Sequence, residues 1–142
     1  MTDNAVNWAV FGKARAELGA DFVRILGYFR EDGVKCVAEI EEAMRGLNAV
    51  ALVRPAHTLK GDSLQFGAEP LGALAETIEL IARRCVETHD SPAELIEEVV
   101  KLRPLFNETL ALFERETSPL VNRRAGTGFG RKVAAGGSFG TR

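Results

Sequence analysis

The residues with the clearest capacity for chemistry lie in one short segment, residues 56–67, with the sequence AHTLKGDSLQFG. On a helical wheel at about 100° per residue, one sector holds a titratable ring, a cation, a glycine and a leucine: His57, Lys60, Gly61 and Leu64. The roughly opposite sector holds residues suited to a protein core: Leu52, Ala56, Leu59, Ser63 and Phe66. This pattern predicts a helix that presents an imidazole and an amine to solvent.

Gly61 is the unusual residue of this segment. A glycine inside a helix costs about 1 kcal/mol relative to alanine, and here it removes a side chain from the surface beside His57. We therefore expect another molecule to approach the ring closely. An exposed imidazole is largely neutral near neutral pH, and its nitrogen can then attack phosphorus. Lys60, one turn along, offers a flexible positive charge for phosphoryl oxygens.

This segment resembles the phospho-accepting helix of the histidine-phosphotransfer (HPt) domain family of bacterial two-component phosphorelays. The family motif is H-x-L-K-G, often with a further glycine six residues on, and the matching residues here are His57, Leu59, Lys60, Gly61 and Gly67. The resemblance covers about residues 5 to 116. It implies that His57 accepts a phosphoryl group and passes it to or from receiver-domain aspartates. It also implies a sensor histidine kinase as a partner, and Mg²⁺ supplied by the receiver, so that this chain holds no metal or cofactor.

Three further residues near His57 have two interpretations each. Arg54 could extend the positive patch or be an ordinary solvated arginine. Leu64 could belong to a surface that docks the receiver, or it could pack against the second helix. Gln65 could hydrogen-bond near the ring and fix its tautomer, or be a solvated glutamine.

Apolar residues recur every three to four positions, which predicts an all-α fold. We expect a short helix over about residues 4–18, then long helices over about 21–45, 48–67, 70–88 and 92–116, with Ile96 among the core residues of the last. Asp21, Asn48 and Ser91 are the expected N-caps. Short connections between long amphipathic helices predict an up-down antiparallel four-helix bundle, with the first helix as an extra element at one end.

Two prolines interrupt this pattern. Pro55 and Pro104 lie inside predicted helices, where proline removes a backbone hydrogen bond and clashes with the preceding turn. Because the apolar period continues across both prolines, we expect kinked helices. The alternative is that each proline begins a separate helix.

Composition excludes several classes of protein. No apolar run is long enough for a transmembrane helix, and the N-terminal residues do not form a secretory signal. Cys36 and Cys85 have no metal-binding spacing and fall on apolar stripes, so we expect buried free thiols in a reducing cytoplasm, although the sequence leaves a disulfide open. No Gly-rich nucleotide loop occurs, so no kinase or ATPase activity is expected.

Charge divides the chain near residue 117. Residues 1–116 carry 13 basic and 20 acidic side chains, whereas residues 117–142 carry five basic and no acidic ones. We therefore expect a helical domain over 1–116 and a Gly-rich, basic, disordered tail over 117–142. Phosphoryl shuttling is the favoured function, by a protein expected to be monomeric. The alternatives are a helical adaptor that docks receivers or kinases without phosphotransfer, and a nucleic-acid-associated protein, which the acidic body disfavours.

Overall fold

The computed structural model describes residues 2–118, and the predicted tail from residue 119 onward lies outside the described residues. The chain divides into two compact units, residues 1–109 and residues 110–142. In the second unit, the described residues continue the last helix to Thr117, whose hydroxyl donates to the carbonyl oxygen of Phe113 at 2.9 Å. The predicted domain boundary near residue 117 stays a prediction.

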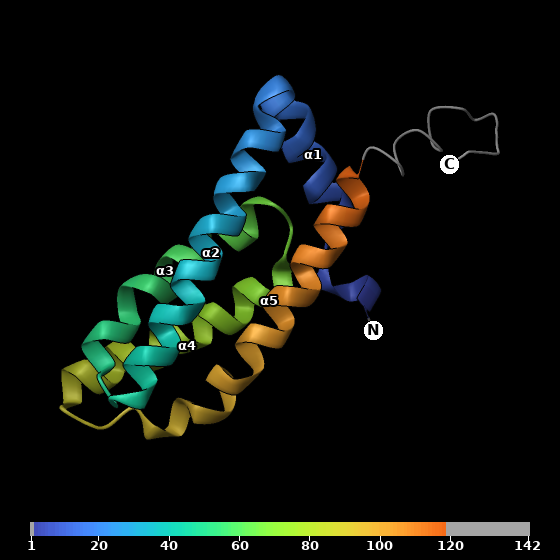
Figure 1. Cartoon of the computed structure of the whole chain (residues 1–142). Helices are drawn as coiled ribbons and strands as arrows, with labels where there is room; N and C mark the ends of the chain where they lie inside the picture. The colour runs from blue at the N-terminus through green and yellow to red at the C-terminus, as the bar shows by residue number, and fades with distance from the viewer. Residues whose placement is uncertain (1, 119–142) are drawn as a thin grey trace, which may run out of the picture. The chain divides into compact units, whose positions relative to one another are not determined.

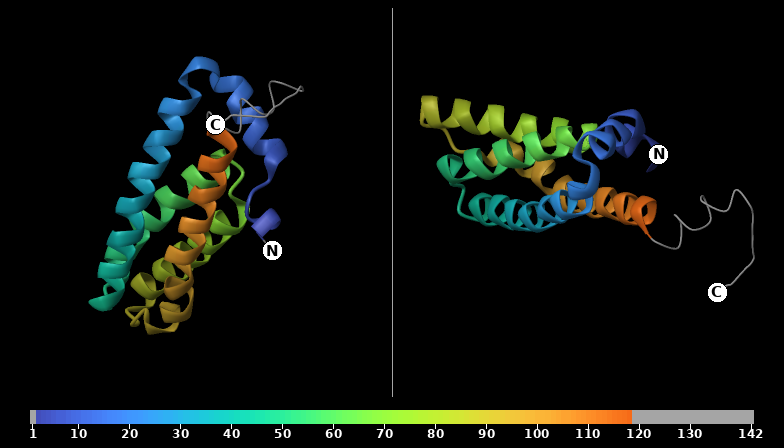
Figure 2. Two further views of the ribbon diagram at one scale, coloured as in Figure 1. Left: turned by 45° about the vertical axis from the view of Figure 1, so that its right-hand side comes forward. Right: turned by 90° about the horizontal axis from the view of Figure 1, so that it is seen from above.

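The described residues are helical and contain no strand. The α-helices are α1 (Trp8–Leu18), α2 (Phe22–Arg45), α3 (Ala49–Gln65), α4 (Glu69–Thr88) and α5 (Ile96–Thr117), with 3₁₀ turns at Thr2–Ala5, Gly19–Asp21 and Ala93–Leu95. From α2 to the first part of α5, each helix runs antiparallel to the one before it (Figure 1, Figure 2). The prediction of an antiparallel four-helix bundle with an extra N-terminal helix is confirmed.

Local sequence signals explain where the helix that carries His57 begins and ends. Asn48 caps α3, because its side-chain oxygen accepts the backbone N–H of Ala51 at 3.1 Å. Gly67 follows α3 with φ of +81°, a left-handed conformation that glycine adopts most readily. A Cβ there would also lie 2.5 Å from the carbonyl oxygen of Asn7, so this turn requires glycine for two reasons.

Three details of the predicted helices are wrong. The first helix begins at Trp8 rather than Asn4, because the side chain of Asn7 accepts backbone N–H groups from residues 9 and 10 and starts a new helix. Asp21 forms an ion pair with Arg24 instead of a capping bond. Ile96 is exposed rather than buried, since the 3₁₀ turn at Ala93–Leu95 shifts the phase of the residues that precede α5.

Both internal prolines lie within continuous helices. α3 runs through Pro55 and α5 runs through Pro104, so the alternative of separate helices is wrong. Ser91 still accepts a bond from the backbone N–H of Ala93 at 3.2 Å, but this bond caps the 3₁₀ turn that precedes α5.

Aromatic rings form a connected core through the first unit. Successive edge or tilted contacts join Trp8, Phe11, Phe22, Phe66, Phe29 and Phe106, with ring centroids between 5.1 and 6.0 Å apart. Such pairs contribute beyond the apolar area that they bury. Because Phe66 directly follows α3, the ring network fixes the end of the helix that carries His57. Cys36 and Cys85 are buried and free, as predicted.

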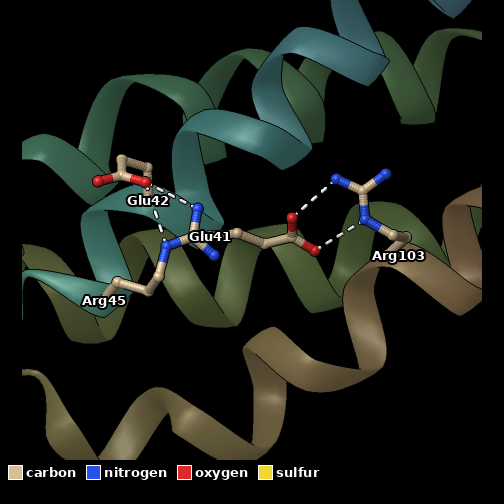
Figure 3. Close-up of polar contacts among 4 residues, drawn as sticks. All are labelled: Glu41, Glu42, Arg45 and Arg103. Carbon is tan, nitrogen blue, oxygen red and sulfur yellow. Dashed lines mark hydrogen bonds and ion pairs between the residues drawn. The ribbon is translucent and has the colours of Figure 1, made fainter.

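An ion pair ties α5 to α2 at the surface. Arg103 donates to both carboxylate oxygens of Glu41, at 2.7 and 2.9 Å (Figure 3). The hydrogen bonds from Arg103 lower the pKa of Glu41. Beside this pair, Arg45 bonds to Glu42 within α2. The pair links the first part of α5 to α2, and its bidentate geometry is the one in which a planar guanidinium matches a carboxylate.

Candidate functional site around His57

His57 lies on the exposed side of α3. Its side chain is 60% exposed, whereas the residues predicted to form the core sector are all buried: Leu52, Ala56, Leu59, Ser63 and Phe66. The helical wheel therefore predicted correctly which side of this helix faces the core and which side faces solvent. Arg54, Gly61 and Leu64 are exposed along the same stripe of α3.

Glu79 of α4 holds the imidazole in one orientation. Its Oε2 lies 2.9 Å from Nδ1 of His57. A carboxylate can only accept hydrogen bonds, so we assign the ring proton to Nδ1. This tautomer leaves Nε2 with its lone pair available as the nucleophile.

Glu79 is a buried anion surrounded by cations. Only 4% of its side chain is exposed, and Lys60 Nζ lies 3.0 Å from Oε1 while Arg83 Nη2 lies 2.9 Å from Oε2. Burial alone would raise the pKa of Glu79, but its contacts with Lys60, Arg83 and His57 outweigh it and lower the pKa to about 2. Glu79 is therefore ionised throughout the physiological pH range.

Lys60, which the sequence placed on the solvent-facing sector of its helix, extends toward α4. Its side chain is 23% exposed and ends on Glu79. The sequence predicts that this charge stabilises a phosphoryl group, and in the structure the amine is paired with the carboxylate of Glu79. The amine lies one helical turn from His57 and shares Glu79 with it, so its charge remains next to the ring.

Gly61 leaves an open surface beside the ring. A Cβ built on Gly61 would meet nothing within 4 Å among residues 2–118, so packing within this part of the chain does not require glycine at this position. In contrast, a Cβ on Gly72 would lie 2.7 Å from Cδ2 of Leu64 and 3.7 Å from the carbonyl oxygen of Lys60. Gly72 thus lets α4 approach α3 closely beside Leu64 and the backbone of Lys60.

The other predicted residues have different surroundings. Leu64 is 47% exposed, and its side chain lies next to Gly72 of α4. Gln65 is exposed at the end of α3, and the His57 ring donates its hydrogen bond to Glu79 instead. Arg54 is exposed one turn before His57 and lines a groove between α3 and α4.

The sequence of this helical domain matches one protein-family model. The Hpt domain model matches residues 24–115. The chain belongs to the Hpt domain family. The match covers all of α3 and α4, the two helices that build the His57 site, together with nearly all of α2 and most of α5. No curated protein and no solved structure gave a significant match.

Sequence analysis of this Hpt domain missed Glu79 and Arg83. One signal was present, because Glu79 interrupts the apolar stripe of α4 formed by Ala75, Ile78 and Ala82. A buried acid is rare unless it is paired. An acid at a core position of the helix that follows the histidine helix was thus a reason to look for a cationic partner.

Two kinds of feature are absent from the part of the chain that the structure describes. Within residues 2–118, no group of three or more His, Cys, Asp or Glu side chains could hold a metal ion. In the same part of the chain, no helix combines the length and apolarity needed to cross a bilayer.

Proposed function

We propose that this Hpt domain accepts a phosphoryl group on Nε2 of His57 from the aspartyl phosphate of a receiver domain, and passes it on to another receiver aspartate. The observation that carries the proposal is the buried, ionised Glu79 at 2.9 Å from Nδ1 of an otherwise exposed histidine. Mg²⁺ and the acceptor aspartate belong to the receiver. A sensor histidine kinase is the source of the phosphoryl group upstream.

In the transfer step, one bond forms at His57 and one bond breaks at the aspartyl phosphate. The Nε2 lone pair forms the N–P bond, the P–O bond of the aspartyl phosphate breaks, and its electron pair leaves on the receiver carboxylate. The imidazole keeps its proton on Nδ1 and becomes positively charged. Glu79 lies next to that charge and stabilises it, as preorganised groups do for developing charge in a water-poor site.

The same arrangement supports the reverse step. A protonated, positively charged phosphoimidazole is a better leaving group than a neutral one, and Glu79 keeps the Nδ1 proton in place. Lys60 and Arg83 place two positive charges beside the ring, where phosphoryl oxygens would be neutralised, which is the main requirement of phosphoryl transfer. A non-catalytic adaptor would have no need for this set of charges.

The test is phosphoryl transfer from a phosphorylated receiver domain with Mg²⁺. Wild type should acquire a label that is stable in base and lost in acid, and His57→Gln should acquire none. His89→Asn is the matched control, because His89 is the second of two histidines and lies exposed at the end of α4 with φ of +60°, which asparagine tolerates. Equal labelling of wild type and His57→Gln would refute the proposal.

His57→Gln should also keep the fold. The side chain is exposed and its loss opens no cavity, so helicity and melting temperature should remain close to those of wild type. A large loss of structure would mean that the absence of label had a trivial cause, and the circular dichroism spectrum of the variant checks this.

A further inference from the structure

An open groove lies between α3 and α4, adjoining the His57 site. Its volume is about 710 Å³, and its lining includes Val50, Val53, Arg54, Leu80, Arg83 and Arg84. Val50, Arg54 and His57 stand at positions i, i+4 and i+7 of α3, so they share one face of the helix. At about 1.5 Å per residue, the groove extends roughly 10 Å along α3 from His57.

The groove brings exposed aliphatic side chains and several arginines together on one surface. Its aliphatic side chains are well exposed, with 69% of Val50 and 56% of Leu80 in contact with solvent. Its lining also contains three arginines and one acid, Glu87, although acidic residues outnumber basic ones by seven over residues 1–116. The charge of the groove is therefore opposite to that of the domain around it.

The arginines differ in how much of their charge is already compensated. Arg83 pairs with Glu79 and Arg84 pairs with Glu94. No carboxylate of residues 2–118 is within ion-pair distance of Arg54. A positive, partly apolar surface is thus presented next to the nucleophile, and it favours an occupant that brings carboxylates and apolar side chains together.

We propose that this groove is the docking surface for the protein that exchanges the phosphoryl group with His57, and that it binds an apolar segment of that partner flanked by carboxylates. The proposal rests on the function proposed above. Apolar contact with Val50 and Leu80 supplies affinity, and the arginines supply orientation and faster encounter. Docking here places the partner against the side of α3 that carries His57, with Gly61 leaving space for its loops.

Nucleic acid is the other occupant that a basic groove could take. The excess of acid in the domain opposes a polyanion, because phosphate contacts need a positive field over several phosphates. The aliphatic residues between the arginines also offer no aromatic surface on which bases could stack. A partner protein with a mixed acidic and apolar surface fits both features.

The experiment measures the rate of phosphoryl transfer to the full chain as a function of receiver concentration. The donor is the phosphorylated receiver domain that labels wild type fastest. Leu80→Ser should raise the half-saturating receiver concentration about tenfold. Arg84→Gln should raise it about threefold and weaken its dependence on salt. Val100→Ser and Lys101→Gln are matched controls on α5, where both residues are exposed, and both should leave the half-saturating concentration unchanged.

The outcomes separate the docking proposal from the proposed function. If wild type is labelled and Leu80→Ser and Arg84→Gln match the controls, the groove is not the docking surface. A fall in maximal rate with an unchanged half-saturating concentration would also overturn the proposal. If no receiver labels wild type, the function itself is refuted and the groove proposal falls with it. Melting curves of each variant establish that the fold is retained.

Discussion

Replacing Glu79 by glutamine tests the electrostatic centre of the site. The substitution keeps the size of the side chain and removes the charge that Lys60, Arg83 and His57 share. In the folded protein the pKa of Glu79 falls from 4.5 to about 2. Because each pKa unit is worth about 1.4 kcal/mol, the folded state favours the carboxylate by about 3 kcal/mol. We expect Glu79→Gln to lower the free energy of unfolding at pH 7 by about this amount.

The stabilisation that Glu79 provides should decrease as the pH is lowered. A carboxyl group whose pKa is lowered by folding stabilises the protein above its unfolded pKa, and that contribution is lost as the pH falls toward the folded pKa. The difference between wild type and Glu79→Gln should therefore be constant above about pH 5. It should shrink as the pH falls from 4.5 toward about 2, because wild type then loses the charge that distinguishes it from the variant.

Urea unfolding at pH 7, 5, 4 and 3, followed by circular dichroism, measures this difference. Glu76→Gln is the matched control, since Glu76 lies one turn earlier on α4 and is exposed; its effect should stay below about 0.5 kcal/mol. A difference below about 1 kcal/mol at pH 7 for Glu79→Gln, or one that does not change with pH, would refute the assignment of Glu79 as a strongly stabilised anion. Transfer to His57 should also slow at least tenfold in Glu79→Gln.

Two glycine substitutions give further predictions. Gly61→Ala should raise the free energy of unfolding by up to about 1 kcal/mol, because alanine favours helix and nothing among the described residues lies within 4 Å of the new methyl group. The same methyl group should slow phosphoryl transfer from a receiver to His57. An unchanged transfer rate would show that the partner does not need this space. Gly33→Ala should destabilise by about 1–3 kcal/mol through overpacking, because its Cβ would lie 2.3 Å from the buried Phe106 ring. Gly27→Ala is the control in the same helix, where the new methyl group has open space, and it should be neutral or stabilising. Urea unfolding midpoints measure both variants. A lower midpoint for Gly27→Ala than for Gly33→Ala would contradict the overpacking predicted at Gly33.

Much of the fold followed from local rules. The spacing of apolar residues located α2 to α5, and Asn48 and Gly67 marked the ends of α3 because capping and left-handed turns depend on nearby backbone groups. The first helix was less predictable, since its start depends on Asn7, whose backbone N–H also donates to the carbonyl oxygen of Gly67. That bond joins residues far apart in sequence.

The sequence by itself determined which face of α3 is exposed, because helical periodicity places His57 and Gly61 opposite the core stripe. Only the tertiary structure decided what His57 contacts. Glu79 is 22 residues away, and its carboxylate reaches Nδ1 because α4 packs against α3 in one rotational register, with Gly72 allowing close approach. Periodicity defines faces of single helices, whereas the pairing of faces depends on packing between them. For that reason the partner of Lys60 and the groove beside His57 appear only in the folded protein.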